Sequence, residues 1–179
     1  MVYVMLGTGF EEIEALTPVD LLRRAGVDVM TVGINGKTVF GGHGIGVQAD
    51  ITVEQMDLTN LEMIVLPGGL GGVASIRASQ ETLDAVRFAY ENGCFVAAIC
   101  AGPTVLADLG ITEGRHTTCY PGQTVNMGGA VVEECAAVRD GKIITGASAG
   151  CAVAFALALI EALRDRETAQ KIREQIVIR

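Results

Sequence analysis

The sequence predicts an α/β fold in which a mainly parallel central sheet carries helices on both faces. Two observations predict it. Short runs of β-branched and small apolar residues, typical of strands buried on both faces, alternate along the chain with longer segments of helical periodicity. Several of these runs end at glycine-rich loops, and ligands in such sheets bind beyond the carboxyl ends of the strands. The 179 residues, half of them hydrophobic, are enough for one domain over residues 1–179.

The elements alternate in a regular order through the first half of the chain. Gly26 and the pair Asn35-Gly36 bound one of the strands, and Pro67 ends another. Expected strands are residues 2–6, 27–33 and 63–66, and expected helices are residues 11–25, 73–78 and 81–90. Residues 39–47 contain the glycine-rich run Gly41-Gly42-His43-Gly44 between two short apolar segments. This stretch is expected to form either a hairpin or a glycine-rich loop.

The second half begins with the apolar run at residues 95–99, which is followed by Cys100, a Gly-Pro turn and a helical stretch at residues 104–109. Short strands are then expected near Thr117 and at residues 130–132, 136–138 and 143–144. A helix at residues 151–163 and a charged C-terminal helix complete the pattern. The apolar helix at 151–163 is too short to span a bilayer.

Charge and cysteine content exclude several classes of protein. The net charge of -8 argues against a nucleic-acid surface, since the few basic residues are scattered and lack interleaved aromatic residues. Neither a targeting segment nor a membrane span is recognisable, so we expect a cytoplasmic protein. Five cysteines without a CxxC pair or zinc-type spacing are expected to be reduced thiols, and we expect no metal.

Cys100 is the candidate nucleophile, because strand, cysteine, sharp turn and helix together indicate a nucleophile elbow. Such an elbow needs small neighbours where the backbones crowd together, and Ala98 and Gly102 stand two residues before and after the cysteine. Pro103 suits the first turn of a helix. A helix that points its N-terminus at the sulfur would lower the pKa of the thiol. The alternative is a buried structural cysteine.

A carboxylate is the candidate partner of this thiol. Glu11, Glu12 and Glu14 open a predicted helix, where acidic residues ordinarily complement the helix dipole. Glu14 is also drawn toward the apolar stripe by Pro18, which should disturb the helix. A half-buried carboxyl group beside a thiolate would have a raised pKa and could shuttle a proton. Periodicity alone does not choose between Glu14 and Glu11.

Three loops follow predicted buried strands, at residues 7–14, 67–72 and 100–102, and are expected to converge on one crevice. Glycine pairs in these loops let backbone N–H groups approach a developing oxyanion. The stretch 68–72 could instead cradle a phosphate, as in a flavin site, although it lacks both the phosphate-loop ending and the dinucleotide fingerprint.

Taken together, seven motifs resemble the ThiJ/PfpI superfamily, and within it the branch of the parkinsonism-associated deglycase and its bacterial relatives. The motifs occur in order over essentially the whole chain, at residues 9–14, 17–20, 23–26, 66–69, 97–104, 118–122 and 155–161. The resemblance implies a flavodoxin-like sandwich, usually a homodimer, that needs no cofactor.

The resemblance also implies roles for individual residues. Cys100 matches the family's reactive, oxidation-prone cysteine, and Glu14 matches the carboxylic acid that hydrogen-bonds it. Gly69 and Ala101 match the backbone N–H donors that face the sulfur. His43 falls in the hairpin expected near the dimer interface, where it could reach the site of the neighbouring subunit.

Other residues are candidates for lining the pocket, and some depart from the family pattern. Tyr120 stands where the branch often has histidine, and Ala101 stands where the protease-like branch has its histidine base. Residues 146–151 replace a turn that carries an arginine in the family, which puts anion selectivity in doubt. Cys119 is a candidate resolving cysteine if its loop folds over Cys100. His116 is a candidate for lining the pocket, against the simpler interpretation of a solvated side chain.

These observations predict a cysteine enzyme of the glyoxalase or deglycase type that acts on a small reactive carbonyl compound. Sulfur would add to the aldehyde, backbone N–H groups would hold the oxyanion, and Glu14 would move protons. The alternative is an oxidation sensor, a redox-regulated chaperone or binding module, in which Cys100 becomes a sulfinate. A class I amidotransferase is excluded because no histidine follows His116.

Overall fold

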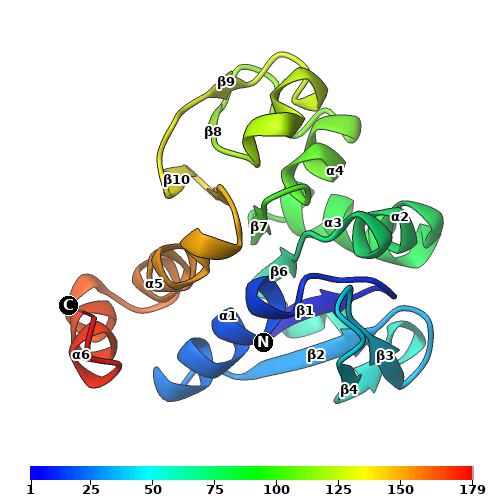
Figure 1. The fold of residues 1–179 in the computed structure, drawn as a ribbon, viewed down its shortest axis with the longest axis horizontal. Coiled ribbons are helices and arrows are strands. Elements are labelled where there is room, and N and C mark those ends of the chain that lie inside the picture. The colour runs from blue at the N-terminus through cyan, green and yellow to red at the C-terminus, as the bar shows by residue number, and fades with distance from the viewer. Residues whose placement is uncertain (179) are drawn as a thin grey trace.

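The central sheet contains seven strands among residues 1–178, which are the residues that the computed structural model describes (Figure 1). Its order is β10-β11-β7-β6-β1-β2-β5, and every neighbouring pair is parallel except β10 with β11. The strands are β1 (Val2–Leu6), β2 (Val29–Gly33), β5 (Ile51–Thr52), β6 (Met63–Leu66), β7 (Phe95–Ile99), β10 (Ala137–Asp140) and β11 (Ile143–Gly146). The predicted mainly parallel sheet is confirmed.

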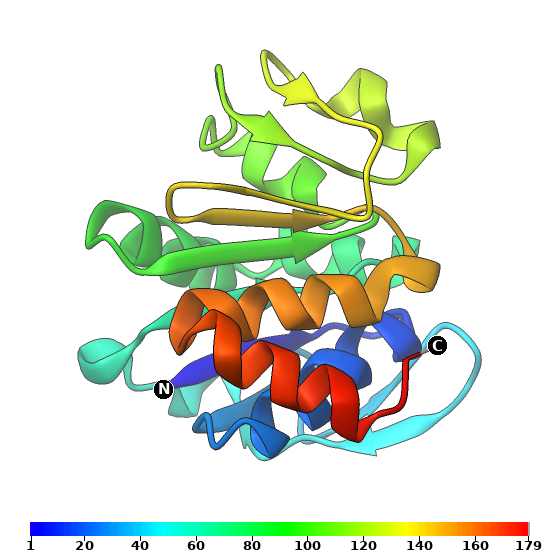
Figure 2. The same ribbon diagram turned by 90° about the vertical axis from the view of Figure 1, so that its left-hand side faces the viewer.

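Helices cover both faces of this sheet, as the sequence predicts. They are α1 (Glu12–Arg24), α2 (Leu70–Ala78), α3 (Gln80–Glu91), α4 (Pro103–Asp108), α5 (Ala152–Leu163) and α6 (Arg166–Gln175). Side chains of a strand point alternately to its two faces. Val2, Val4 and Leu6 therefore join the core under α1, α5 and α6, while Tyr3 and Met5 join the core under α2, α3 and α4. Figure 2 shows α5 and α6 lying across one face.

Two smaller pairs of strands lie outside the sheet (Figure 1). β3 (Thr38–Phe40) and β4 (Gly46–Gln48) form an antiparallel hairpin. Of the two alternatives that the sequence allows for residues 39–47, the hairpin is therefore the one observed. β8 (His116–Thr117) and β9 (Val131–Val132) pair in parallel beside the main sheet. Short 3-10 helices complete the described chain: η1 (Val53–Gln55), η2 (Leu58–Asn60), η3 (Pro121–Asn126) and η4 (Ala149–Cys151).

The differences from the predicted elements are small and have local causes. β5 is missing from the prediction because two residues are too few to show a period. α1 runs without a break through Pro18, so the expected disturbance does not end the helix there. α2 starts three residues earlier than expected, because Gly69 at φ 86° serves as its N-cap. Within residues 1–178, no helix is both long and apolar enough to cross a bilayer.

Candidate active site

Cys100 occupies the strand-to-helix elbow that the sequence predicts. It follows β7 directly, and its φ of 65° lies in the left-handed region, which non-glycine residues rarely adopt. Two hydrogen bonds hold this conformation: the Cys100 N–H donates to the Gly146 carbonyl at 2.9 Å, and the Cys100 carbonyl accepts from the Tyr120 N–H at 2.9 Å. The strained backbone is therefore fixed by a neighbouring strand on one side and by the loop before η3 on the other.

Two glycines make room for the elbow. A Cβ atom at Gly102 would lie 2.5 Å from the Leu66 carbonyl oxygen, which confirms the expected need for a small residue two positions after the cysteine. A Cβ atom at Gly68 would lie 2.5 Å from Glu14 Oε2 and 2.8 Å from Cys100 Cβ. Gly68 lies in the glycine-rich loop after β6, and the contacts that require glycine at this position come from segments far apart in the sequence.

Glu14 is the carboxylate beside the sulfur. Its side chain is fully buried, and its Oε2 accepts a hydrogen bond from the Gly68 N–H at 2.9 Å. Oε1 has no nitrogen or oxygen partner among the described residues, and the polar group that interacts with this carboxyl from the other side is the Cys100 thiol. Glu11, the alternative that periodicity left open, remains partly exposed at the mouth of the site.

The pKa of the Cys100 thiol is shifted in the direction opposite to the one expected. Burial, the charge of Glu14 and the hydrogen bond with Glu14 together raise the pKa of Cys100 to about 12, and burial is the largest of these causes. The Ala101 N–H lowers the pKa, but this effect is smaller. The expected lowering by a helix N-terminus is therefore wrong for a thiol that faces a charged carboxylate, because α4 is short and desolvation dominates.

Burial also raises the pKa of Glu14, against the lowering effect of its hydrogen bonds with Cys100 and Gly68. The contact between the two acids acts in opposite directions on them, because it lowers the pKa of Glu14 and raises the pKa of Cys100. The titrations of the two groups are coupled through this contact.

A cavity of about 310 Å³ opens onto Cys100. Of the residues predicted for the site, Cys100, Gly69, Ala101 and Tyr120 line it. The Ala101 N–H is in hydrogen-bond contact with the sulfur. Gly69 lies on the cavity wall, and its role as a donor stays a prediction.

Three residues that are not predicted from the sequence complete the wall of the cavity. They are Glu11, Leu70 and Gln123. Glu11 had been explained as a first-turn acid. No local pattern marks Leu70 or Gln123, because the chain brings them to the cavity from α2 and η3.

Cys119 and His116 are not at this cavity. Cys119 is buried and faces a neighbouring hollow, because its peptide runs between β8 and the loop that carries Tyr120. His116 lies on β8, where Nδ1 is 2.5 Å from Glu133 Oε1 and the ring remains exposed. Assignment of these two residues to the wall of the Cys100 cavity is corrected accordingly.

His43 does not line the cavity either, because Glu12 holds it. The His43 N–H donates to Glu12 Oε1 at 2.8 Å, and Nδ1 lies 2.9 Å from Glu12 Oε2. This hydrogen bond raises the pKa of His43. Together with Glu11, the two residues place potential metal ligands within 4.8 Å of one another. Both Glu12 oxygens are already used by His43.

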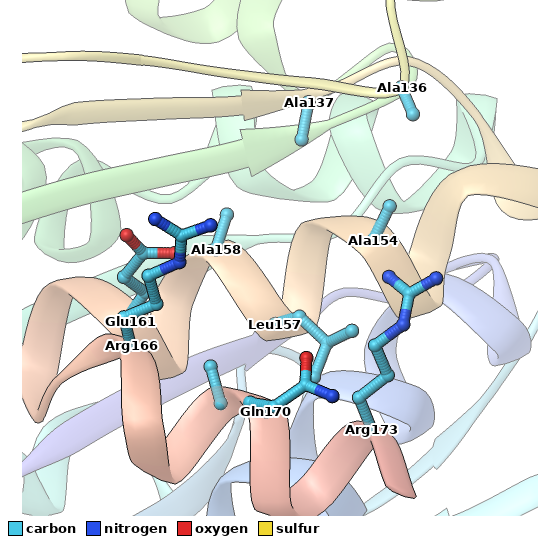
Figure 3. A pocket seen from close by; sticks show the side chains of 10 residues that line it. Ala136, Ala137, Ala154, Leu157, Ala158, Glu161, Arg166, Gln170 and Arg173 are labelled. Carbon is cyan, nitrogen blue, oxygen red and sulfur yellow. The ribbon is translucent and has the colours of Figure 1, made fainter. Parts of the chain in front are cut away.

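Another hollow, of about 440 Å³, lies between α5, α6 and the start of β10 (Figure 3). Its labelled side chains include two arginines of α6, Arg166 and Arg173, together with several alanines. None of the residues predicted for catalysis or binding lines this hollow. The cavity at Cys100 is therefore the candidate site.

The chain belongs to the DJ-1/PfpI family, whose model matches residues 1–162. The match spans every element that contributes to the site and ends within α5. The family resemblance drawn from the seven motifs is confirmed.

Individual relatives agree with this assignment. The chain is 36% identical to protein dj-1beta of Drosophila melanogaster, over 98% of this chain and 95% of the relative. It is 31% identical to a protein named deglycase PH1704 of Pyrococcus horikoshii, over 76% of this chain and 82% of the relative. The solved structure of oxidized DJ-1 of Toxoplasma gondii superposes with a TM-score of 0.93 at 31% identity, covering 98% of this chain and 97% of that one.

We expect Gly68→Ala to disconnect the two acids while the fold persists, because the added methyl group must displace either Glu14 Oε2 or Cys100 Cβ. A displacement of about 1 Å at a reacting group costs roughly a hundredfold in rate. The rate of alkylation of Cys100 should therefore change, as followed by mass spectrometry. Gly150→Ala is the matched control, since its Cβ would find nothing closer than 3.9 Å. Equal behaviour of the two variants would contradict this packing.

Glu14→Gln is expected to raise the melting temperature at pH 7. The folded pKa of Glu14 lies above the ordinary value, so the protonated form stabilises the fold below that value and this contribution is lost as pH rises through the folded pKa. Glutamine cannot ionise, so it avoids this loss. Calorimetry should show the difference shrinking toward pH 4. A variant that is less stable at pH 7 by an amount independent of pH would contradict the sign.

Proposed function

We propose that this protein is a cofactor-independent cysteine enzyme that converts small 2-oxoaldehydes, or their adducts, into 2-hydroxy acids. One observation carries the proposal: the Cys100 thiol lies on the wall of a small cavity and is hydrogen-bonded to the buried acid Glu14, so that a proton can pass between them. The cavity of about 310 Å³ has room for a three-carbon oxoaldehyde such as methylglyoxal. The substrate is thus a small carbonyl compound.

The first step is addition of Cys100 Sγ to the aldehyde carbon. Glu14 takes the thiol proton as the bond forms, which removes the barrier that the raised pKa of Cys100 would otherwise impose. The oxygen that gains charge is held by backbone N–H groups, for which Ala101 and Gly69 are the candidates. Glu14 then gives the proton to this oxygen, so that the product is a neutral hemithioacetal and Glu14 is again a carboxylate.

The second step moves hydrogen from the aldehyde carbon to the neighbouring carbon. Glu14 removes the C–H proton, and the hydroxyl proton passes to the neighbouring carbonyl oxygen, which gives an enediolate. Glu14 then returns its proton to the adjacent carbon, which leaves the thioester of a 2-hydroxy acid on Cys100. Water then attacks the thioester, releases the 2-hydroxy acid and restores the thiol. The overall reaction is the addition of one water molecule to the oxoaldehyde, so no redox cofactor is consumed.

The relatives support this reaction class without naming a substrate for this chain. The Pyrococcus horikoshii relative is named a deglycase, and the identity with it covers most of both chains. The expected homodimer and cytoplasmic location, and the reach of His43 into a neighbouring subunit, stay predictions. So does the assignment of residues 1–179 to one domain.

The reaction is tested by following lactate formation from methylglyoxal with the pure protein. Cys100→Ala should abolish turnover, and Glu14→Gln should lower kcat by roughly 10²–10⁴-fold, the range for loss of a general base. Cys94→Ala is the control, because that thiol donates to the Leu61 carbonyl at 3.0 Å and does not line the cavity. Turnover that survives in Cys100→Ala, or an unchanged kcat in Glu14→Gln, would contradict the mechanism.

Oxidation sensing is the second candidate function, and the partial exposure of Cys100 favours it. The deep burial of Glu14 places an acid where it could donate to a sulfinate oxygen. Mild peroxide followed by peptide mass spectrometry separates the two functions. The enzyme predicts repeated turnover with Cys100 unoxidised, whereas selective sulfinate at Cys100 with negligible turnover would establish the sensor.

A further inference from the structure

Three of the five cysteines line a hollow that the proposed reaction does not use. Its volume is about 580 Å³, and the cysteines on its wall are Cys119, Cys135 and Cys151. Cys119 is buried, Cys151 is half-buried and Cys135 is exposed. All three are free thiols in the part of the chain that the structure describes. Only Tyr120 separates Cys119 from Pro121 on this wall, and Tyr120 itself faces the Cys100 cavity.

The β10–β11 ladder brings Cys135 close to the start of α5. These strands are antiparallel, and their pairing continues one residue beyond the sheet, where the Ala147 N–H donates to the Ala136 carbonyl at 3.1 Å. The next residue on one side is Cys135, and the next on the other side is Ser148. Directly opposed residues in such a ladder have Cβ atoms about 4.5–5.5 Å apart.

Ser148 connects this position to the second thiol. Its hydroxyl donates to Cys151 Sγ at 3.5 Å, because η4 folds the chain back within three residues. Burial raises the pKa of Cys135, and so do the charge of Glu133 and that of Cys151, which shows that the two thiols lie within electrostatic range. Cys135 also lies in an exposed bend between β9 and β10, where its thiol donates to the Ala137 carbonyl at 3.5 Å.

We propose that Cys135 and Cys151 form a reversible disulfide by exchange with a small-molecule disulfide such as oxidised glutathione. The Cys135 thiolate attacks one sulfur of the oxidant, and one glutathione leaves and takes up the proton that Cys135 gave up. Cys151 then attacks the Cys135 sulfur in the mixed disulfide and expels the second glutathione. Two protein thiols are oxidised and one disulfide is reduced to two thiols, so atoms and electrons balance.

The disulfide would tie the segment between β9 and β10 to the beginning of α5. This is a modification site separate from Cys100, so it does not depend on the proposed reaction. Cys135 reacts first with the oxidant because it is the exposed thiol of the three. Cys151 is the resolving thiol because it contacts the hydroxyl of Ser148, the residue that follows the last paired position opposite Cys135.

The experiment is peptide mapping of the full chain after incubation with oxidised glutathione, under non-reducing conditions. Trypsin cleavage places Cys119 and Cys135 on residues 116–139, Cys151 on residues 143–164, and the two remaining cysteines on residues 88–115. We expect a cross-link between 116–139 and 143–164 that dithiothreitol removes. Cys119→Ser should retain it and Cys135→Ser should lose it, with Cys94→Ser as the matched control that retains it.

Three results would overturn the proposal. Loss of the cross-link in Cys119→Ser would assign the bridge to Cys119 and Cys151 instead. A stable glutathione adduct on Cys135 with Cys151 unmodified would show that no resolving thiol is in reach, and absence of any change at both residues would show that the pair does not exchange. The Cys119→Ser variant keeps both proposed partners, so the test holds even where Cys135→Ser fails to fold.

Discussion

The conformation of Cys100 is the constraint on which the rest of the site depends. A cysteine at φ 65° can occupy the end of a parallel strand only where its backbone is held from both sides and no Cβ atom crowds it. Gly146 and Tyr120 supply the hydrogen bonds, and Gly68 and Gly102 supply the space. The central sheet thereby presents one sulfur atom at its carboxyl edge, facing a cavity rather than the core.

The carboxyl group of Glu14 determines what this sulfur can do. An isolated buried thiol would be unreactive, because burial raises its pKa. Burial also raises the pKa of the carboxyl in contact with it. In the proposed reaction this carboxyl takes the thiol proton when the sulfur attacks a carbonyl carbon. Burying this acid lowers the stability of the fold, and the same burial places the acid where it can exchange a proton with the sulfur. Replacing either acid removes the partner to which the proton would move.

Much of the fold is legible in the sequence because it depends on local patterns. Buried parallel strands give continuous apolar runs, and the elbow requires small residues at fixed positions around Cys100, so both were predicted. Ala101 and Tyr120 were reached only through the family resemblance. The choice of Glu14 over Glu11 could not be made from periodicity, because both positions border the apolar stripe and the deciding contact with Gly68 joins segments far apart in the chain.

The errors have the same origin. The pKa of Cys100 depends on burial and on a neighbouring charge, and a single helix end visible in the sequence could not outweigh these. His43 and His116 are each held by a glutamate that tertiary structure brings to them, Glu12 and Glu133. A motif shows which residue types are present, whereas their partners are set by the packing of the whole chain.

The most direct test of the coupling between Glu14 and Cys100 is one NMR titration that follows the ¹³C shifts of the Glu14 carboxyl carbon and of Cys100 Cβ. If the two titrations are coupled, both signals change in the same pH transitions, because ionisation of either group alters the other. Two separate transitions, each seen only in the signal of its own residue, would contradict the account.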